Sequence, residues 1–403
     1  MPEFFIGRQP ILDRDMRLHA YELLFRSGQQ GNQAGTLDDN YATSQVIITA
    51  FTEIGLENLV RDRLAFVNIP YRFIAEPDLL PMHPDQVVLE VLESVKIDDA
   101  VVAGIEKLHQ RGFTIALDDF VYGEEYERVM PYISIIKIDI TQFPPEQWET
   151  EVRRAQQRGC RVIAEKVETN EEYERLRALN VDFYQGYFFA KPKVISGRRI
   201  TSNKLSLLHL MAGVNNPDIE IEELQRLISK DIGISVKALN YVNSAASGLN
   251  RKVDSIHEAI VYLGRATIRS WVTLFIMSSV DDKPDELMTM ALVRARFCEK
   301  LAEHLDRERK DRYFTVGLFS VLDSLLDMPL EEVLATMSLP DAMQVALMHH
   351  EGDKGQALRV AMDLEMGMEV ESPFPEISDE TLAELHFDAM SWADTSLASM
   401  GVR

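Results

Sequence analysis

The sequence predicts an α/β domain followed by an all-α domain, and two observations lead to this fold class. Up to about residue 195, short apolar runs alternate with stretches of helical periodicity. After about residue 200 the strand-like runs stop, and helical periodicity continues to about residue 368. A repeated strand–helix order over this length indicates a parallel (β/α) barrel or a doubly wound sheet in the first half.

The strands expected in the first half are continuous apolar runs rather than alternating ones. Such runs are typical of strands that are covered on both faces, as in parallel sheets with helices outside. The expected strands span residues 4–12, 64–69, 87–91, 113–120, 134–140, 161–167 and 182–189.

Two of the helices between these strands have recognisable ends. Asp98 or Asp99 can cap one helix, and Gly112 can end it. Asn170 can cap another helix. The apolar faces of these two helices carry Val102, Ile105 and Leu108, and Tyr173, Leu176 and Leu179.

The second half reads as helices separated by short turns. One helical face carries Ile221, Leu224, Leu227 and Ile228, and the next carries Val236, Leu239 and Val242. The polar segment 193–204 is the expected junction, and an acidic tail leads to a last amphipathic stretch with Leu382, Leu385 and Trp392. We therefore expect domains at residues 1–195 and 200–370, followed by a C-terminal acidic segment and helix at 371–403.

Composition excludes several classes of protein. The formal net charge of -23 disfavours nucleic-acid binding, because such a surface repels phosphate backbones. The two cysteines do not support a disulfide framework or a cysteine-based zinc site. The N-terminal residues lack a secretory signal, and the apolar runs are too short to span a bilayer. We therefore expect a cytoplasmic protein with no membrane partner.

Polar side chains recur at the carboxyl end of nearly every expected strand in the first half. In a (β/α) barrel these ends face one mouth, where active sites are built from several strands. Taken singly, each residue is more simply a helix cap, a solvated carboxylate or a salt-bridge partner. The joint pattern predicts a site, and its members are Glu22, Asn68, Glu90, Asp118, Asp119, Lys137, Glu165 and Gln185.

Carboxylate and amide oxygens are the ligands that hard divalent cations such as Mg²⁺ or Mn²⁺ prefer. Two such ions about 3.5–4 Å apart clamp the attacking and leaving oxygens during phosphodiester hydrolysis. Asp118 and its neighbour Asp119 could reach both ions, and Lys137 could steady the attacking hydroxide.

At these residues the first half, over roughly residues 1–195, resembles the EAL domain, a barrel that hydrolyses cyclic di-GMP to linear pGpG with Mg²⁺ or Mn²⁺. The resemblance is carried by several short motifs, each weak alone and specific together. They are RQPILD, YELLFR with Glu22 and Arg26, FVNIP with Asn68, LEVLES with Glu90 and Glu93, LDDF, IKID, AEKVET with Glu165 and Glu168, and QGYFF with Gln185.

The resemblance implies a role for each of these positions. Glu22, Asn68, Glu90 and Asp118 would hold metal, with Asp119 on the second ion. Lys137 would contact the catalytic water, and Glu165 would be the general base or a ligand. The remaining implied roles are substrate phosphate binding by Arg26, a site wall at Gln185, and support from Glu93 and Glu168.

The segment after the paired aspartates departs from the family pattern. It reads VYGEEYERV, with Val121 in place of a glycine and two added carboxylates, Glu124 and Glu125. Lys166 likewise replaces a glycine. Glycine permits backbone shapes that other residues disfavour. This departure supports an alternative to the enzyme: a receptor for cyclic di-GMP, or a protein-interaction scaffold.

Residues of roughly 200–370 resemble an HDOD domain, an all-helical relative of the HD phosphohydrolases. The resemblance includes the Asn243-Ser244-Ala245 turn and the Leu263-Gly264 pair. Where a metal-binding His-Asp motif would be expected, the chain reads GLFSVLDSLLD. The adjacent His349 and His350 do not face one another on a helix, so a metal there is not expected.

The two halves together resemble the EAL–HDOD signalling proteins of bacteria. The resemblance implies cyclic di-GMP as ligand, a non-catalytic HDOD domain that docks an unknown protein partner, and a homodimer as one assembly to test. A barrel enzyme acting on another phosphate or sugar is a weaker hypothesis, since no motif specifies such a ligand.

Overall fold

The computed structural model describes residues 4–27, 55–80, 82–120, 123–191, 202–216, 219–230, 232–243, 252–278, 280, 283–305, 310–337, 339–368, 370 and 372–399. The chain divides into two compact units. One unit comprises Met1–Phe188 with Glu365–Glu369, and the other comprises Phe189–Leu364 with Val370–Arg403. Of the predicted junction, residues 193–204, the part up to residue 201 lies outside the described residues and the rest begins a helix, so the predicted domain limits stay predictions.

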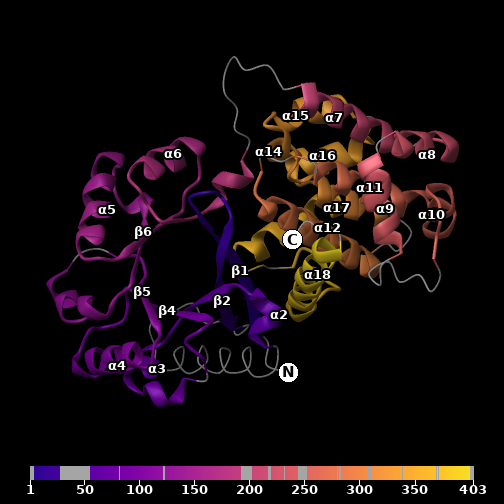
Figure 1. Cartoon of the computed structure of the whole chain (residues 1–403). Helices are drawn as coiled ribbons and strands as arrows, with labels where there is room; N and C mark the ends of the chain where they lie inside the picture. The colour runs from indigo at the N-terminus through magenta and orange to yellow at the C-terminus, as the bar shows by residue number, and fades with distance from the viewer. Residues whose placement is uncertain are drawn as a thin grey trace. The chain divides into compact units, whose positions relative to one another are not determined.

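The first unit is a closed barrel of eight strands, each paired with the next along the chain (Figure 1). The structure thus selects the barrel from the two folds that the sequence allowed. The strands are β1 (Phe4–Asp13), β2 (Leu18–Ser27), β3 (Leu64–Asn68), β4 (Val87–Val91), β5 (Thr114–Leu117), β6 (Ile135–Asp139), β7 (Arg161–Glu165) and β8 (Phe183–Gln185).

The barrel differs from the prediction at its first two strands. The segment holding Glu22, which is not among the expected strands, is itself β2, and β1 runs antiparallel to both β2 and β8. The other neighbouring pairs are parallel. The hairpin lacks the usual Asn-Gly signal: Met16 takes a φ of 62°, and the Asp13 carboxylate accepts hydrogen bonds from the Asp15 and Arg17 amides.

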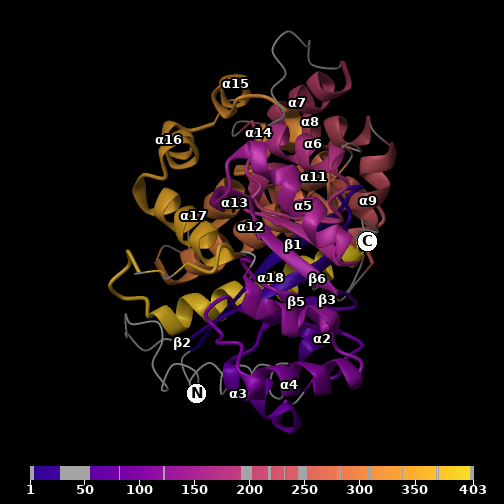
Figure 2. The ribbon, with the colours of Figure 1, turned by 90° about the vertical axis from the view of Figure 1, so that its left-hand side faces the viewer.

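Short helices and 3₁₀ turns follow the strands of the barrel. Helix α3 lies beside α4 in both views (Figure 1 and Figure 2). The bounds are α2 (Leu56–Val60), α3 (Tyr71–Ala75), η2 (Pro77–Leu79), α4 (Asp99–Gln110), η3 (Glu124–Arg128), η4 (Met130–Tyr132), η5 (Ile140–Gln142), η6 (Pro145–Gln147), α5 (Trp148–Gln157), α6 (Asn170–Ala178) and η7 (Tyr187–Ala190).

Two predicted helix starts can be compared with the structure. Asp98 caps α4 by accepting a hydrogen bond from the Val101 amide, which decides between Asp98 and Asp99. The prediction of Asn170 as the cap of α6 is wrong by one residue, because Thr169 caps the helix. Thr169 and Glu172 form a capping box, in which each side chain accepts from the other residue's backbone amide.

A layer of apolar side chains fills the barrel, with one residue from each strand. The layer consists of Ile11, Ala20, Phe66, Val88, Ala116, Ile135, Ile163 and Phe183, all buried. Side chains in a strand alternate between inside and outside, so the residue two positions further along points inward again. This register decides which side chains reach the mouth of the barrel.

Among the described residues the second unit contains helices and no strand. Within it, α12 packs against α13 and α18. The helices are α7 (Ser202–Val214), α8 (Ile221–Ser229), α9 (Ile232–Val242), α10 (Ile256–Leu263), α11 (Arg265–Met277), α12 (Asp285–Leu305), α13 (Lys310–Phe319), α14 (Leu322–Leu326), α15 (Leu330–Ala335), α16 (Asp341–His349), α17 (Gly352–Glu365) and α18 (Asp379–Ser399).

One predicted face in this unit is wrong in part. Val236 of α9 is 50% exposed and Val242 is buried as predicted, and the described side chains that α9 buries are Ile234, Ala238 and Val242. These follow a four-residue spacing in place of the predicted three-residue spacing.

Of the predicted histidine pair, His349 is exposed at the end of α16 and His350 ends the helix with a φ of 55°.

Within the described ranges, no helix is long and apolar enough to cross a bilayer.

Candidate active site

A layer of polar side chains lies directly above the apolar layer of the barrel. On each strand from β2 to β8 the polar residue follows the apolar one by two positions, as the alternation of strand side chains requires. The structure therefore brings the predicted residues to one mouth. They are Glu22, Asn68, Glu90, Asp118, Lys137, Glu165 and Gln185.

Lys137 is the centre of this polar layer. Its side chain is 1% exposed, and its Nζ atom contacts four carboxylates that come from four different strands or strand ends. The distances are 2.7 Å to Glu90 Oε1, 2.8 Å to Asp118 Oδ1, 2.9 Å to Glu165 Oε1 and 3.2 Å to Glu22 Oε2. One buried ammonium thus faces four acids, so further positive charge or bound protons would balance the site.

Two amide side chains complete the layer around Glu22. Gln185 Nε2 donates to Glu22 Oε2 at 2.7 Å and to Gln9 Oε1 at 2.9 Å. Asn68 Nδ2 donates to Glu22 Oε1 at 3.4 Å. These contacts fix the Glu22 carboxylate from both sides.

Several buried oxygens of the layer receive no hydrogen bond from the described residues. They are Asn68 Oδ1, Gln185 Oε1 and Glu90 Oε2. Glu90 is fully buried, and its Oε1 atom, which likewise receives no hydrogen bond from the described residues, forms an ion pair with Lys137 Nζ at 2.7 Å. Unsatisfied buried acceptors are costly, and a cation at the mouth would satisfy them.

Burial and crowding change the pKa values of these groups. Burial raises the pKa of Glu90 well above its ordinary value, and the neighbouring Glu22 adds to the effect. Burial raises the pKa of Glu165 to about 8, against the opposing influence of Lys137. Burial alone would lower the pKa of Lys137, but the surrounding carboxylates outweigh it and raise that pKa well above its ordinary value.

Asp119 lies beside this layer because the backbone bulges at its position. The Asp118 amide donates to the Val91 carbonyl on β4, and the Phe120 amide donates to the Lys137 carbonyl on β6. Between them Asp119 takes a φ of 45°. Burial raises the pKa of Asp119, the negative charge of Asp118 adds to this, and the positive charge of Lys166 opposes it.

The carboxylate and amide oxygens of the polar layer are the kind of ligand that a hard divalent cation binds. Each of the four carboxylates places one oxygen against Lys137, and the second oxygen of Glu22 accepts from Asn68 Nδ2. Unsatisfied amide and carboxylate oxygens face the same layer. In the described part of the chain, no three Asp, Glu, His or Cys side chains are arranged to hold an ion as they stand. The acids turn to Lys137 instead, so ion binding would require them to rotate.

The other predicted residues lie outside this layer. Arg26 is on β2, but its side chain is outside the described part, as are Val121 and Tyr122 of the departing segment. Glu93 and Glu168 are exposed. Glu124 and Glu125 begin η3 and are also exposed.

Two residues of the site are not among those predicted from the sequence. Asp139 lies two positions after Lys137 on β6, so the alternation that placed Lys137 inside would also have found it. Gln9 lies two positions before Ile11, on the strand that runs in the opposite direction, and it pairs with Glu22 in the register. Gln9 could not be placed without knowing that β1 is antiparallel.

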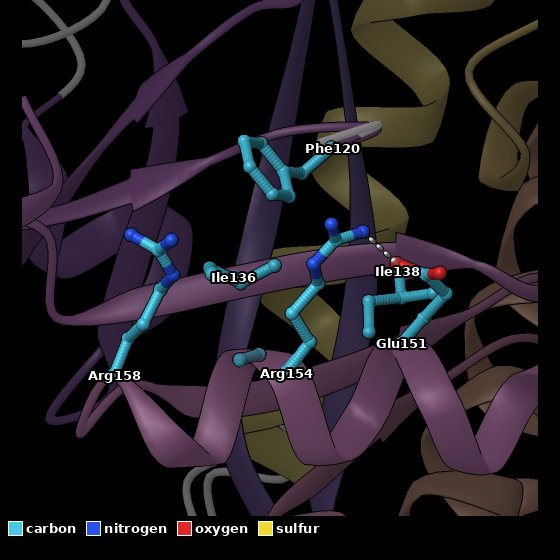
Figure 3. A pocket seen from close by; sticks show the side chains of 7 residues that line it. Phe120, Ile136, Ile138, Glu151, Arg154 and Arg158 are labelled. Carbon is cyan, nitrogen blue, oxygen red and sulfur yellow. Dashed lines mark ion pairs between the residues drawn. The ribbon is translucent and has the colours of Figure 1, made fainter. Parts of the chain in front are cut away.

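A pocket lies on the other face of β6, away from Lys137 (Figure 3). Ile136 and Ile138, which alternate with Lys137 along the strand, form its floor together with Phe120. Arg154 of α5 and Arg158, which follows the end of α5, lie at its edge, and both take part in ion pairs: Arg154 with Glu151 and Arg158 with Glu127. The pocket is therefore separate from the polar layer.

Two family models match the chain. An EAL domain model matches residues 148–192, a range that includes Glu165 and Gln185. An HDOD domain model matches residues 204–336, within the helical unit.

Curated relatives align with both halves of the chain. Cyclic di-GMP phosphodiesterase CdgJ of Vibrio cholerae is 34% identical over 358 residues, which are 88% of this chain and 83% of the relative. The uncharacterized protein YuxH of Bacillus subtilis is 31% identical over 370 residues, 90% of each chain. Among solved structures, an EAL domain protein from Listeria monocytogenes is 21% identical with a TM-score of 0.36, covering 46% of this chain and 87% of that chain. The structural similarity is too low to carry an argument about activity.

Proposed function

The chain belongs to the EAL–HDOD family, and from this premise we propose that its barrel hydrolyses cyclic di-GMP to linear pGpG with Mg²⁺ or Mn²⁺. The observation that carries the proposal is the polar layer at the barrel mouth, in which four carboxylates surround the buried Lys137. The relative CdgJ, named as a cyclic di-GMP phosphodiesterase, supports the substrate.

The proposed metal ligands are the oxygens of the layer. Glu22, Asn68, Glu90 and Asp118 would hold one divalent ion, and Asp119 is the ligand that a second ion would use. The unsatisfied Asn68 Oδ1 and Glu90 Oε2 atoms support this assignment. An ion bound there supplies Lewis acidity to the phosphodiester and lowers the pKa of water.

Lys137 and Glu165 are the proposed catalytic residues. Lys137 stays charged at neutral pH, so it can hold a water or hydroxide and stabilise the charge that develops on the phosphate. Glu165, whose pKa is raised to about 8, can accept the proton of the attacking water once its own proton is lost, and a pKa close to the working pH suits a general base. Their contact at 2.9 Å keeps both groups together.

The remaining residues have proposed roles in binding and support. Arg26 would bind a substrate phosphate, and Gln185 would form a wall of the site while holding Glu22. Glu93 would support the segment after the aspartates, consistent with its electrostatic influence on Asp119. Glu168 would be a supporting carboxylate near α6.

The helical half is the proposed regulatory part. We assign it no catalytic role, and we propose that it docks a protein partner that controls the barrel in the cytoplasm. A homodimer is a further assembly that a solution mass measurement tests directly.

The test is a turnover assay on the full chain with cyclic di-GMP and either Mn²⁺ or Mg²⁺, with linear and cyclic dinucleotides separated by chromatography. The wild-type chain should form pGpG. Asp118→Asn and Glu22→Ala should each lower the rate at least about 100-fold, the size expected when a metal ligand is lost. Asp78→Asn is the matched control, since Asp78 is an exposed carboxylate paired with Lys107 away from the mouth.

A second candidate function is a receptor or scaffold, favoured by the exposed acids Glu124 and Glu125 in η3, close in sequence to the site. The same assay separates the functions when calorimetry with cyclic di-GMP is added. Binding without cleavage over hours with either metal indicates a receptor, and neither binding nor cleavage indicates a scaffold.

A further inference from the structure

A second lysine lies at the mouth of the barrel, beside a second group of acids. Lys166 Nζ contacts Asp139 Oδ2 at 2.7 Å. The Asp139 side chain is 3% exposed, whereas Lys166 is 57% exposed, so the ion pair reaches from the surface into the barrel. Thr141 donates two further hydrogen bonds, from its amide and its hydroxyl, to the other oxygen of Asp139.

The backbone directs Lys166 toward this group. Lys166 follows Glu165 at the end of β7 and takes a φ of 55°, the left-handed conformation that Asp119 also takes at 45°. The next amide, that of Val167, donates to the Gln185 carbonyl on β8. The side chain after Glu165 therefore leaves the strand direction and reaches across to β6.

The side chains of this second group also interact through their charges. The negative charges that act on Asp119 are those of Asp118, Asp139 and Glu93, and the positive charge that acts on it is that of Lys166. Lys166 in turn is influenced by Asp119, Asp139 and Glu165. Each of the two acidic groups at the mouth thus has its own ammonium: Lys137 in the inner group and Lys166 in the outer group.

We propose that the Lys166 ammonium takes the place of a second divalent cation beside Asp119 and Asp139, so that this chain binds one divalent ion where the two-ion mechanism uses two. The inference rests on the proposed function, because it assumes that the inner group holds an ion. An ammonium fixed a few ångströms from a divalent ion repels it, and it neutralises the carboxylates that the ion would need.

Lys166 is in this proposal a specificity-determining residue rather than a catalytic one. Lys166 sets how many ions the barrel takes and so how strongly activity depends on metal concentration. A simple surface ion pair, by contrast, would leave the number of bound ions unchanged when Lys166 is replaced.

The test is a titration of the metal-free full chain with Mn²⁺ by calorimetry, with electron paramagnetic resonance to detect coupling between neighbouring ions. No nucleotide is added, so the result does not depend on turnover. The wild-type chain should bind one Mn²⁺. Lys166→Gly removes the charge and suits the positive φ, and it should bind two Mn²⁺ ions with a coupled spin signal. Its affinity for the second ion should be at least tenfold higher than any affinity of the wild-type chain for a second ion.

Three further variants isolate the charge of Lys166. Lys166→Arg keeps the charge and should bind one ion. Lys166→Asn removes the charge, tolerates the left-handed backbone and should match Lys166→Gly, which keeps the test valid if the glycine variant unfolds. Lys107→Ala removes one positive charge from an exposed pair with Asp78 and should bind one ion.

Two equal Mn²⁺ sites in the wild-type chain, or an unchanged ion count in both uncharged variants, would overturn this inference and leave the proposed hydrolysis standing. A wild-type chain that binds no Mn²⁺ would overturn both proposals.

Discussion

Replacing Lys137 with methionine should destabilise the metal-free barrel by about 3–5 kcal/mol at pH 7.5, because it leaves buried carboxylates without their cation. The ammonium contacts four carboxylate oxygens at 2.7 to 3.2 Å. With an effective dielectric constant of about 20, each contact is worth roughly 5–6 kcal/mol. The desolvation of the lysine itself, and proton uptake by the acids in the variant, reduce the net cost to the stated range.

The assay is urea unfolding in the presence of a chelator, followed by the fluorescence of Trp148 at the start of α5. Trp271 and Trp392, the other two tryptophans, are replaced with phenylalanine so that the signal reports the barrel unit alone. With a slope of about 2–3 kcal/mol per molar urea, the midpoint should fall by about 1–2 M. At pH 5 the loss should be smaller, because the acids then take up protons more easily.

The matched control is Lys107→Met, an exposed lysine that contacts Asp78 at 2.7 Å. Exposed pairs contribute at most about 1 kcal/mol, so its midpoint should hardly move. If Lys137→Met unfolds at the same urea concentration as Lys107→Met, Lys137 does not balance the buried acids, and the electrostatic account of the site is wrong.

Three further predictions test other parts of the barrel. Gln9→Leu removes the partner that holds Gln185 and should weaken Mn²⁺ binding about tenfold in calorimetry; unchanged affinity would remove Gln9 from the site. Glu165→Gln should flatten the pH dependence of metal-free stability. Between about pH 4.5 and 8 the Glu165 carboxyl keeps a proton in the folded chain that it has lost in the unfolded chain. The free energy of unfolding of the wild type therefore falls by up to about 1.4 kcal/mol per pH unit as the pH rises. If the free energy of unfolding, measured with urea, changes equally with pH in wild type and variant, this account of Glu165 is wrong. Gly186→Ala should lower the free energy of unfolding by more than about 2 kcal/mol, because the added Cβ would lie 2.2 Å from the Val167 carbonyl oxygen. Gly159 also has a positive φ but has no atom within 4 Å of an added Cβ, so Gly159→Ala should lower it by about 1–2 kcal/mol. Equal losses in the two variants would show that Val167 moves to make room.

Strand periodicity explains why so much of the site could be predicted from the sequence. Glu90 and Asp118 each stand two residues after an apolar residue of the barrel core, at the end of an apolar run, and Lys137 stands two residues after Ile135 inside its own run. A continuous apolar run that ends in a polar side chain is a local signal. The register of a parallel barrel then brings these ends to one mouth.

The parts that could not be predicted depend on pairing between distant segments. Whether β1 runs parallel or antiparallel to β8 is decided by the pairing of Ile11 with Gln185, far apart in the chain. The strand containing Glu22 was not among the predicted strands, since the hairpin before it uses Met16 at a positive φ, a position that usually carries glycine or asparagine.

By itself, the sequence determined the two-part architecture, the strand ends with their polar residues, and the family to which the chain belongs. Only the tertiary structure decided that Glu22 and Lys137, 115 positions apart in the chain, are in contact, and that Lys166 reaches Asp139. The physical reason is that burial, charge balance and pKa depend on distances across the barrel. Those distances exist only once the eight strands have closed.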